Sequence, residues 1–305
     1  MKRYTWVIAL LALCQASFAA DSRVMIVSID GLRPDLALRA DMPVLRGILK
    51  SASYTFWATT TPMAVTIPSH TSMLTGVTIE RHGITGNDDK SLAGEKLIIP
   101  TIFDLAKQAG IDSGLVAGKS KFSILAGSVT HAWVTSKSVT LDAEAADRAV
   151  EMIGAYKPRL MVVHFPQVDS VGHGKGWGTV EQIEAIENAD AQLGRVLDEL
   201  KRQNLFNDTT IIISADHGGS GRTHGANDDR SKFIPWIITG PRVRAGLDLT
   251  VIRELNVQTY DTFATACFVL GIVAPSNIDG KIITQAFEAD DLMRAPATQP
   301  QGAAR

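Results

Sequence analysis

The sequence has few cysteines and no large excess of charge of one sign. It holds two cysteines, Cys14 and Cys267, and only Cys267 would remain once an N-terminal leader is removed, so no intramolecular disulfide is expected. The formal net charge is −2, with 30 Lys and Arg against 32 Asp and Glu, and the basic residues are scattered along the chain. A groove that binds nucleic acid is therefore not expected, because such surfaces are strongly basic.

Long apolar runs are also lacking. The apolar stretch 6–13 is well short of the roughly 20 residues that a membrane-spanning helix needs, so no stable membrane anchor is expected. Lys2 and Arg3 precede this stretch, and Ser17-Phe18-Ala19 after it has small residues at both positions that a signal peptidase reads. We predict that residues 1–20 are a secretory signal peptide and that the mature protein is periplasmic or secreted.

The rest of the chain predicts one α/β domain over residues 21–288. A chain that is 45% hydrophobic and 20% charged can bury one substantial core. Short apolar runs alternate with helical patterns, which is typical of a mostly parallel central sheet with helices on both faces. The expected strands are 24–30, 111–117, 159–165, 209–215 and 233–239, and the expected helices include 42–52, 101–109, 142–156, 179–203 and 256–271. The composition of residues 289–305, rich in Ala, Pro and Gln, predicts a disordered tail.

Carboxylates and histidines gather at the carboxyl ends of three expected strands. They are Asp30, Asp169, His173, Asp216, His217 and His224. In open α/β sheets, ligands bind at this edge. Asp169 and His173 are four residues apart and can hold one ion from a single turn, whereas the adjacent Asp216 and His217 can point to two different ions.

The charges of these six side chains favour a two-metal hydrolase of phosphate esters. Three carboxylates and three neutral imidazoles supply −3 against the +4 of two divalent cations, which leaves room for one more anion. An alkoxide nucleophile would fill that place, because two ions about 4 Å apart lower its pKa and stabilise both oxygens of an in-line displacement. The alternative is that each side chain only caps a helix or completes a turn.

The hydroxyl-rich segment ATTTPMAVTIPSHTSMLTG is where a nucleophile is expected. Pro68 suits the first position of a helix, and Thr66 would lie just before it, where free N–H groups and the helix dipole favour a phosphate. Thr66 is therefore the best candidate. Spacing alone leaves open that Thr59, Thr60, Thr61 or Thr66 simply caps the helix.

From about Val24 to Ile283 the chain resembles the alkaline phosphatase superfamily, and most closely its type I phosphodiesterase and nucleotide pyrophosphatase branch. The motifs that carry the resemblance are Asp30-Gly31, Thr66-Ile67-Pro68-Ser69-His70, Thr75-Gly76, His82-Gly83-Ile84 and Asn87. Two departures are that Ser69 stands where the branch usually has Asn, and that His224 lies close to His217, so the long insertion that often shapes substrate specificity is missing.

The resemblance implies an alkaline phosphatase-like fold and a role for each site residue. Thr66 would attack phosphorus and form a phospho-threonine intermediate, while Asn87 would bind a phosphoryl oxygen of a small phosphate-ester substrate. Two metal ions, expected to be zinc, would be held by two sets of ligands. One set is Asp169, His173 and His224, and the other is Asp30, Asp216, His217 and Thr66.

Two lysines leave the substrate class open. Lys119 and Lys121, in GKSKFSILAG, resemble the Lys-x-Arg stretch that monoesterases of the superfamily use against a terminal phosphate. The alternative is that both lysines lie in an ordinary solvated loop and do not bind phosphate. The sequence therefore leaves both activities open, phosphodiesterase and phosphomonoesterase. A hypothesis of another class is a non-catalytic metal- or phosphate-binding protein. The sequence gives no prediction of oligomeric state.

Other histidines and tryptophans have structural interpretations. We expect His82 to set the turn before Asn87, His70 to pack behind the nucleophile, and His164 to lie in a buried strand, none of them contacting metal. Among the tryptophans, Trp177 is the candidate for substrate contact.

Overall fold

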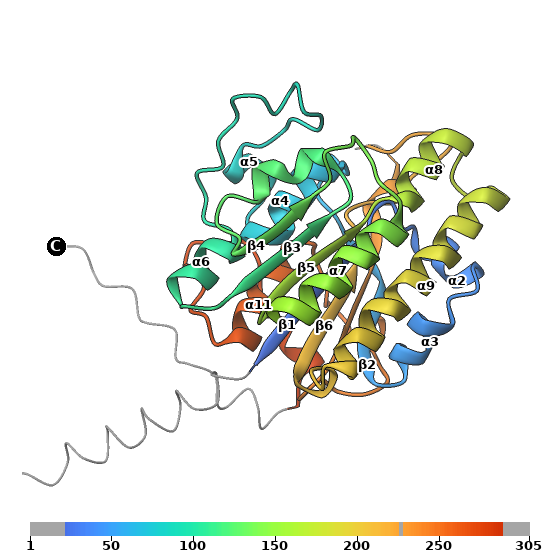
Figure 1. The fold of residues 1–305 in the computed structure, drawn as a ribbon. Helices are drawn as coiled ribbons and strands as arrows, with labels where there is room; N and C mark the ends of the chain where they lie inside the picture. Colours follow the sequence, from blue (N-terminus) through green and yellow to red (C-terminus); the bar gives the residue numbers. More distant parts are fainter. Residues whose placement is uncertain (1–21, 226–227, 289–305) are drawn as a thin grey trace, which may run out of the picture.

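The computed structural model describes residues 22–225 and 228–288, so the predicted signal peptide 1–20 and tail 289–305 lie outside the described residues. At its centre, the described chain forms an eight-stranded sheet in the order β4-β3-β5-β1-β6-β7-β2-β8 (Figure 1). Neighbouring strands are parallel except at β7, which runs antiparallel to β6 and β2. The predicted mostly parallel sheet is confirmed.

All five predicted strands are present, with ends shifted by at most two residues. The observed strands are β1 Arg23–Ile29, β2 Ala52–Thr59, β3 Ser113–Ala117, β4 His131–Val134, β5 Leu160–Phe165, β6 Thr209–Ser214, β7 Phe233–Thr239 and β8 Leu247–Asp248. The sequence reading missed β2, because buried polar side chains interrupt its apolar pattern. One of them, Ser53, is fully buried and donates its hydroxyl to Arg244 O at 2.9 Å.

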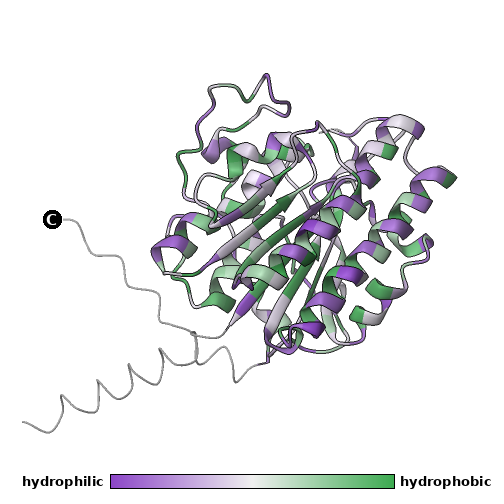
Figure 2. Ribbon diagram, in the orientation of Figure 1, coloured by the Kyte–Doolittle hydropathy of each residue, from purple (hydrophilic) through white to green (hydrophobic). Residues whose placement is uncertain are grey.

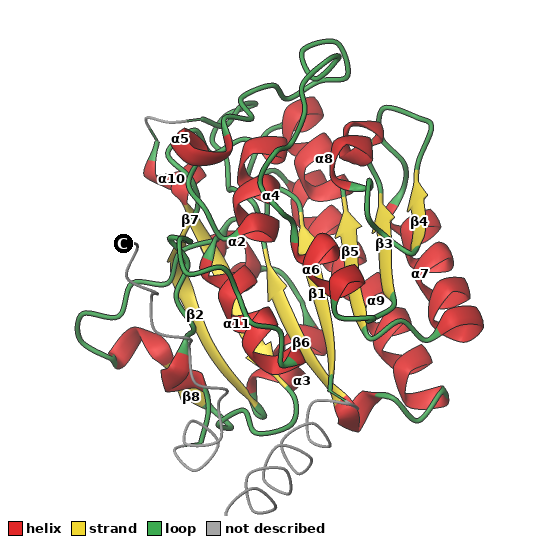
Figure 3. Cartoon of the chain, turned by 90° about the vertical axis from the view of Figure 1, so that its left-hand side faces the viewer, coloured by secondary structure: helices red, strands yellow, loops and turns green. Residues whose placement is uncertain are grey.

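Helices cover both faces of the sheet (Figures 1 and 3). On one face lie α2 Pro34–Arg39, α3 Pro43–Leu49, α7 Asp142–Tyr156, α8 Gln167–Lys175 and α9 Val180–Arg202. On the other lie α4 Thr66–Thr75, α6 Ile102–Gln108 and α11 Asp261–Leu270. The shorter elements are α5 Ile79–His82, α10 Asp229–Lys232 and the 3-10 turns η1 Ser120–Leu125, η2 Phe206–Asp208, η3 Leu249–Val251 and η4 Thr284–Ala286.

Helix α11 begins five residues later than the sequence pattern predicts. The Asp261 carboxylate accepts the Gln258 N–H at 2.7 Å and the Lys281 N–H at 2.8 Å, and so fixes a turn ahead of the helix. Helix α8 was not predicted, because its sequence QVDSVGHGK contains two glycines and lacks a continuous apolar stripe. This short helix positions two of the expected metal ligands.

The core lies between the sheet and its helices, and Figure 2 shows apolar strands beneath helices that are polar on their outer side. All of β5 and all of β1 except Arg23 are buried, as expected for parallel strands covered on both faces. Cys267 is buried in α11, and burial raises the pKa of its thiol to about 12. Within residues 22–225 and 228–288, no helix combines the length and apolar character needed to cross a membrane.

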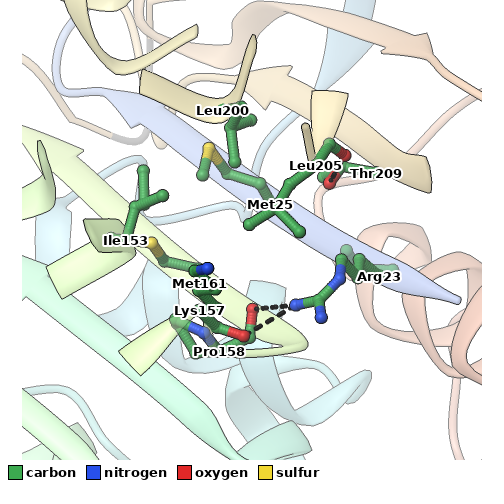
Figure 4. A pocket seen from close by; sticks show the side chains of 10 residues that line it. Arg23, Met25, Ile153, Lys157, Pro158, Met161, Leu200, Leu205 and Thr209 are labelled. Carbon is green, nitrogen blue, oxygen red and sulfur yellow. Dashed lines mark hydrogen bonds between the residues drawn. The ribbon is translucent and has the colours of Figure 1, made fainter. Parts of the chain in front are cut away.

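A small pocket opens at the amino end of β1, where Arg23 lies beside Met25 and Met161 (Figure 4). The Arg23 guanidinium donates to the backbone oxygens of Lys157 at 2.6 Å and Pro158 at 3.3 Å. None of the predicted site residues lines this pocket. The candidate site lies instead at the opposite end of the same strand.

Candidate metal centre

The carboxyl ends of the parallel strands bring distant segments together. Asp30 directly follows β1, and Asp216 and His217 follow β6, its hydrogen-bonded neighbour. On the other side of β1, strand β5 leads into α8, which carries Asp169 and His173. The five residues therefore meet at the edge of the sheet where the sequence pattern placed them.

Two groups of three side chains form there. We name Asp169, His173 and His224 the helix triad, and Asp30, Asp216 and His217 the strand triad. Within each triad the candidate ligand atoms all lie within 4.8 Å of one another. In the helix triad, Asp169 Oδ1 is 3.3 Å from His173 Nε2 and 3.6 Å from His224 Nε2. This grouping is the division of ligands that the family resemblance implied.

The buried carboxylates fit a cation. Among the described residues, Asp30 Oδ1, Asp169 Oδ1 and Asp216 Oδ2 are buried oxygens without a hydrogen-bond partner. A buried charge without full pairing is destabilising, so these oxygens are suited to metal coordination. Burial, followed by the nearby charge of Asp30, raises the pKa of Asp216 well above its ordinary value. The carboxylates therefore need more positive charge than the polypeptide supplies if all are to be ionised.

The site shifts the pKa values of its histidines in opposite directions. Burial, followed by the neighbouring His224, lowers the pKa of His217 to about 3, and burial also lowers the pKa of His224. Their rings stack with centroids 3.7 Å apart. Both are therefore neutral imidazoles, the form that binds a metal. The nearby carboxylate of Asp169 instead raises the pKa of His173.

Lys119 lies between the two triads. Its ammonium is 2.5 Å from Asp169 Oδ2 and 2.7 Å from Asp30 Oδ2, and its side chain is 4% exposed. Burial opposes this charge, but the neighbouring carboxylates raise the pKa of Lys119 above its ordinary value. The alternative of a solvated surface lysine is therefore wrong for this residue.

Lys121 approaches the site from η1. Its Nζ donates to Asn87 Oδ1 at 3.0 Å, and burial lowers its pKa to about 8. The same Asn87 oxygen accepts the backbone N–H of Ile67 at 2.9 Å. The structure thus brings Asn87 and one lysine to the first turn of the helix that carries Thr66.

The Thr66 hydroxyl is fully buried and lies 3.5 Å from His217 Nε2. Thr66 is the first residue of α4 and Pro68 is the third. The prediction that the helix begins at Pro68, with Thr66 just before it, is therefore wrong. The helix begins two residues earlier because Ser69 N donates to Val65 O at 3.0 Å, a helical bond that needs no N–H from Pro68. With the Ile67 N–H donated to Asn87, fewer backbone donors remain for a phosphate than expected.

Neighbouring threonines have other hydrogen bonds. Thr60 donates to Asp216 O, and the hydroxyls of Thr60 and Thr61 lie 3.1 and 2.8 Å from Ser69 Oγ. The Thr59 hydroxyl donates to Asn256 at 3.4 Å. Among these threonines, Thr66 is therefore the one whose hydroxyl faces the strand triad. Ser69 belongs to the hydrogen-bond network of Thr60 and Thr61.

Two buried histidines support the ligands. His164 Nε2 lies 2.8 Å from Asp30 Oδ2, a contact that the sequence reading missed because it depends on strand pairing. His70 Nδ1 lies 2.8 Å from Thr66 O, so His70 packs behind Thr66. His82 accepts the Ile84 N–H at 3.0 Å, so its predicted role in the turn is confirmed. Trp177, the candidate for substrate contact, is buried against the triads.

Comparisons with known proteins agree with this arrangement. The family model described as type I phosphodiesterase/nucleotide pyrophosphatase matches residues 24–96 and 103–228. An uncharacterised pyrophosphatase/phosphodiesterase of Schizosaccharomyces pombe is 25% identical over 216 residues, covering 65% of this chain and 44% of its own. Ectonucleotide pyrophosphatase/phosphodiesterase family member 5 from Homo sapiens is 26% identical over 213 residues. The match covers 64% of this chain and 44% of the human protein. The chain thus spans less than half the length of these two curated relatives.

Solved structures share the fold. An inactive threonine-to-alanine variant of murine ectonucleotide pyrophosphatase/phosphodiesterase 5, in complex with AMP, has a TM-score of 0.74 at 16% identity, covering 88% of this chain and all of its own. A 2-O GAG sulfatase has a TM-score of 0.72 at 15% identity. The match covers 87% of this chain and 74% of the sulfatase chain. The expected alkaline phosphatase-like fold is confirmed. Because the family model matches more than half of its length, the chain belongs to the type I phosphodiesterase/nucleotide pyrophosphatase family.

Proposed function

We propose that this protein is an exported hydrolase of phosphate esters that uses Thr66 as its nucleophile and depends on two divalent metal ions, with zinc as the expected metal. The observation that carries the proposal is the position of the Thr66 hydroxyl, 3.5 Å from His217 Nε2 beside two triads whose carboxylates keep unpaired oxygens. Membership of the family supports the reaction class. The predicted signal peptide supports export to the periplasm or beyond.

Each triad would hold one ion. The helix triad would bind one, and the strand triad together with Thr66 would bind the other. When bound, the two cations would lower the pKa of the threonine hydroxyl and stabilise charge on the attacking and leaving oxygens. Mixed His and Asp ligands suit zinc.

The side chains of the protein divide the remaining work. The Thr66 hydroxyl gives up its proton to water, and its oxygen attacks phosphorus. The new O–P bond forms as the bond to the leaving group breaks, and the leaving oxygen takes up a proton from water. A second water then hydrolyses the phospho-threonine, which frees the phosphate and restores the threonine hydroxyl. Asn87 Oδ1 already accepts from Ile67 N and Lys121 Nζ, so the amide of Asn87 offers its NH₂ group to a non-bridging phosphoryl oxygen. His70 fixes the backbone of Thr66 through its carbonyl oxygen.

A phosphodiester or nucleotide is the proposed substrate class. The family description and the AMP complex of the murine relative support it. A phosphomonoesterase is the second candidate, and the two lysines favour it: Lys119 and Lys121 bring positive charge close to Thr66, which suits the dianionic terminal phosphate of a monoester.

Paired initial rates on bis-p-nitrophenyl phosphate and p-nitrophenyl phosphate test the proposal. The zinc-loaded protein is compared with its Thr66→Ala variant, and Thr59→Ala serves as a matched control because the Thr59 hydroxyl bonds outside the site. We expect Thr66→Ala to lose turnover but keep most of its zinc, and Thr59→Ala to keep both. Near-wild-type turnover in Thr66→Ala would contradict the assignment of the nucleophile.

The preferred substrate in the same assay separates the two candidate activities. A Thr66-dependent preference for the diester supports the phosphodiesterase, and a preference for the monoester supports the phosphatase. Stoichiometric zinc without turnover on either substrate would favour the non-catalytic metal-binding protein.

A further inference from the structure

Trp177 contacts the backbone of every chain segment that carries a triad residue. It follows Gly176, the residue at the end of α8, and is 8% exposed. Its backbone N–H donates to Gly221 O at 2.7 Å, in the loop that leads to His224. The indole is therefore held inside the protein, next to the triads and away from solvent.

The indole joins the β1 loop to α8. Its Nε1–H donates to Gly31 O at 3.0 Å, on the residue that follows Asp30. Its ring packs on Gly172, the residue before His173, so closely that a Cβ added at that glycine would lie 2.8 Å from ring carbons. Glycine is therefore required at position 172 while the indole occupies this place.

The same ring packs on the loop after β6. A Cβ added at Gly219, two residues after His217, would lie 2.3 Å from an indole carbon. One rigid side chain thus fills the space between three segments that are far apart in the sequence. Because the backbone approaches the indole closely at both glycines, the size of the indole sets the distance between these chain segments.

The indole also contacts two triad rings. Its centroid lies 5.3 Å from that of His173, with the rings at 85°, and 6.0 Å from that of His224, with the rings at 73°. These edge contacts are favourable and restrict ring orientation. They add to the contacts that hold the His173 ring, which is 45% exposed: its Nδ1 lies 3.0 Å from Arg222 O, and the His224 ring lies beside it.

We propose that Trp177 is a positioning residue for the metal centre: it fixes the spacing of the three ligand-bearing segments and the orientation of His173 and His224. This inference rests on the proposed function, since it takes the two triads to be metal sites. In this role Trp177 acts through the ligands and not through substrate contact, for which the sequence made it a candidate. Loss of a residue that orients ligands typically weakens metal binding or activity by about 10- to 100-fold.

Zinc affinity, measured by competition with a chromophoric chelator on the full chain, tests this role. We expect Trp177→Leu to weaken binding by about 10- to 100-fold, and Trp177→Phe to weaken it less because an aromatic ring remains. The matched control is Trp57→Leu, a half-exposed tryptophan of β2, which should stay within about twofold of the wild type. Unchanged zinc affinity in Trp177→Leu would overturn the proposal.

A double-mutant cycle separates positioning from general stability. Gly219→Ala places a methyl group against the indole and should weaken zinc binding by itself. Combined with Trp177→Leu it should add little further loss, because the clash is gone; fully additive losses would overturn the proposal. If the far-UV circular dichroism spectrum shows that Trp177→Leu does not fold, the zinc affinities of Trp177→Phe and Gly219→Ala test the proposal instead.

The wild-type titration keeps this inference distinct from the function on which it rests. A wild-type protein that binds no zinc contradicts the proposed function, and this inference with it. Tight wild-type binding that the Trp177 variants retain overturns only the role of Trp177.

Discussion

His164 lies on β5 and Asp30 directly follows the neighbouring parallel strand β1, with His164 Nε2 2.8 Å from Asp30 Oδ2. The Gly118 N–H donates to His164 Nδ1 at 3.3 Å, so the proton of the ring is on Nε2 and is donated to the carboxylate. Burial lowers the pKa of His164, which keeps the ring neutral. One oxygen of Asp30 is thereby oriented by the protein, and the other remains unpaired.

His164→Ala should weaken zinc binding at the strand triad by about 10- to 100-fold, because the carboxylate of Asp30 loses the donor that orients it. Competition with a chromophoric chelator measures this loss. The matched control is His131→Ala, which removes a histidine that stacks on Tyr156, with ring centroids 3.8 Å apart, on edge strand β4. Equal zinc affinity in the two variants would show that the His164 contact is not needed for binding.

Lys121→Met should reduce the rate on p-nitrophenyl phosphate more than the rate on bis-p-nitrophenyl phosphate, because it removes a positive charge near Asn87 while keeping much of the apolar stem. Since burial lowers the pKa of Lys121 to about 8, its charge is present below that pH and lost above it. The wild-type KM for the monoester should accordingly rise above about pH 8, and the variant should lack that rise. Lys90→Met, an exposed lysine of the loop after Asn87, is the control; equal losses on both substrates would argue against discrimination by Lys121.

Removal of metal with a chelator should lower the melting temperature, because the unpaired oxygens of Asp30, Asp169 and Asp216 then lack a cation. Zinc should restore it in a concentration-dependent way, since a ligand at 100 times its dissociation constant stabilises the folded state by about 2.7 kcal/mol per site. Calorimetry across a zinc series measures this. A melting temperature that does not respond to zinc would contradict binding to the folded state.

Asp142→Asn should change how stability depends on pH. Asp142 is fully buried at the start of α7, and its Oδ1 accepts the Gln167 N–H at 2.9 Å, while its Oδ2 has no hydrogen-bond partner among the described residues. Burial raises the pKa of this carboxyl to about 7, so between about pH 4 and 7 the unfolded chain releases a proton that the folded protein keeps. This group therefore lowers the free energy of unfolding by about 1.4 kcal/mol per pH unit as pH rises through that range.

Urea unfolding of both proteins from pH 4 to 8, with chelator present throughout, measures the effect. The stability of Asp142→Asn relative to the wild type should increase up to about pH 7 and then level off. A constant difference across the range would mean that Asp142 titrates normally in the folded protein.

The sequence predicted the parts of the site that follow from strand ends. Asp30 directly follows β1 and Asp216 lies two residues after the end of β6, and burial of these strands fixes where the carboxylates lie. The division into triads followed from the resemblance to the family, and the geometry agrees with it. Local spacing also placed His173 one turn after Asp169, although the helix itself was not predicted.

Contacts that depend on tertiary packing could not be predicted in this way. The pairing of His164 with Asp30 requires the register of β1 against β5, which the sequence of either strand does not specify. Lys119 could reach solvent or the triads from the same backbone position, and its ion pairs with Asp30 and Asp169 form only once β1, β3 and α8 pack together. The role of Trp177 depends on glycines from two other segments.

The ammonium of Lys119 bears on the order in which the protein is assembled. It gives two of the three buried carboxylates a counter-charge that belongs to the polypeptide itself. A chain with such an internal counter-charge has two of these carboxylates offset without a metal ion, so its folding need not wait for metal loading.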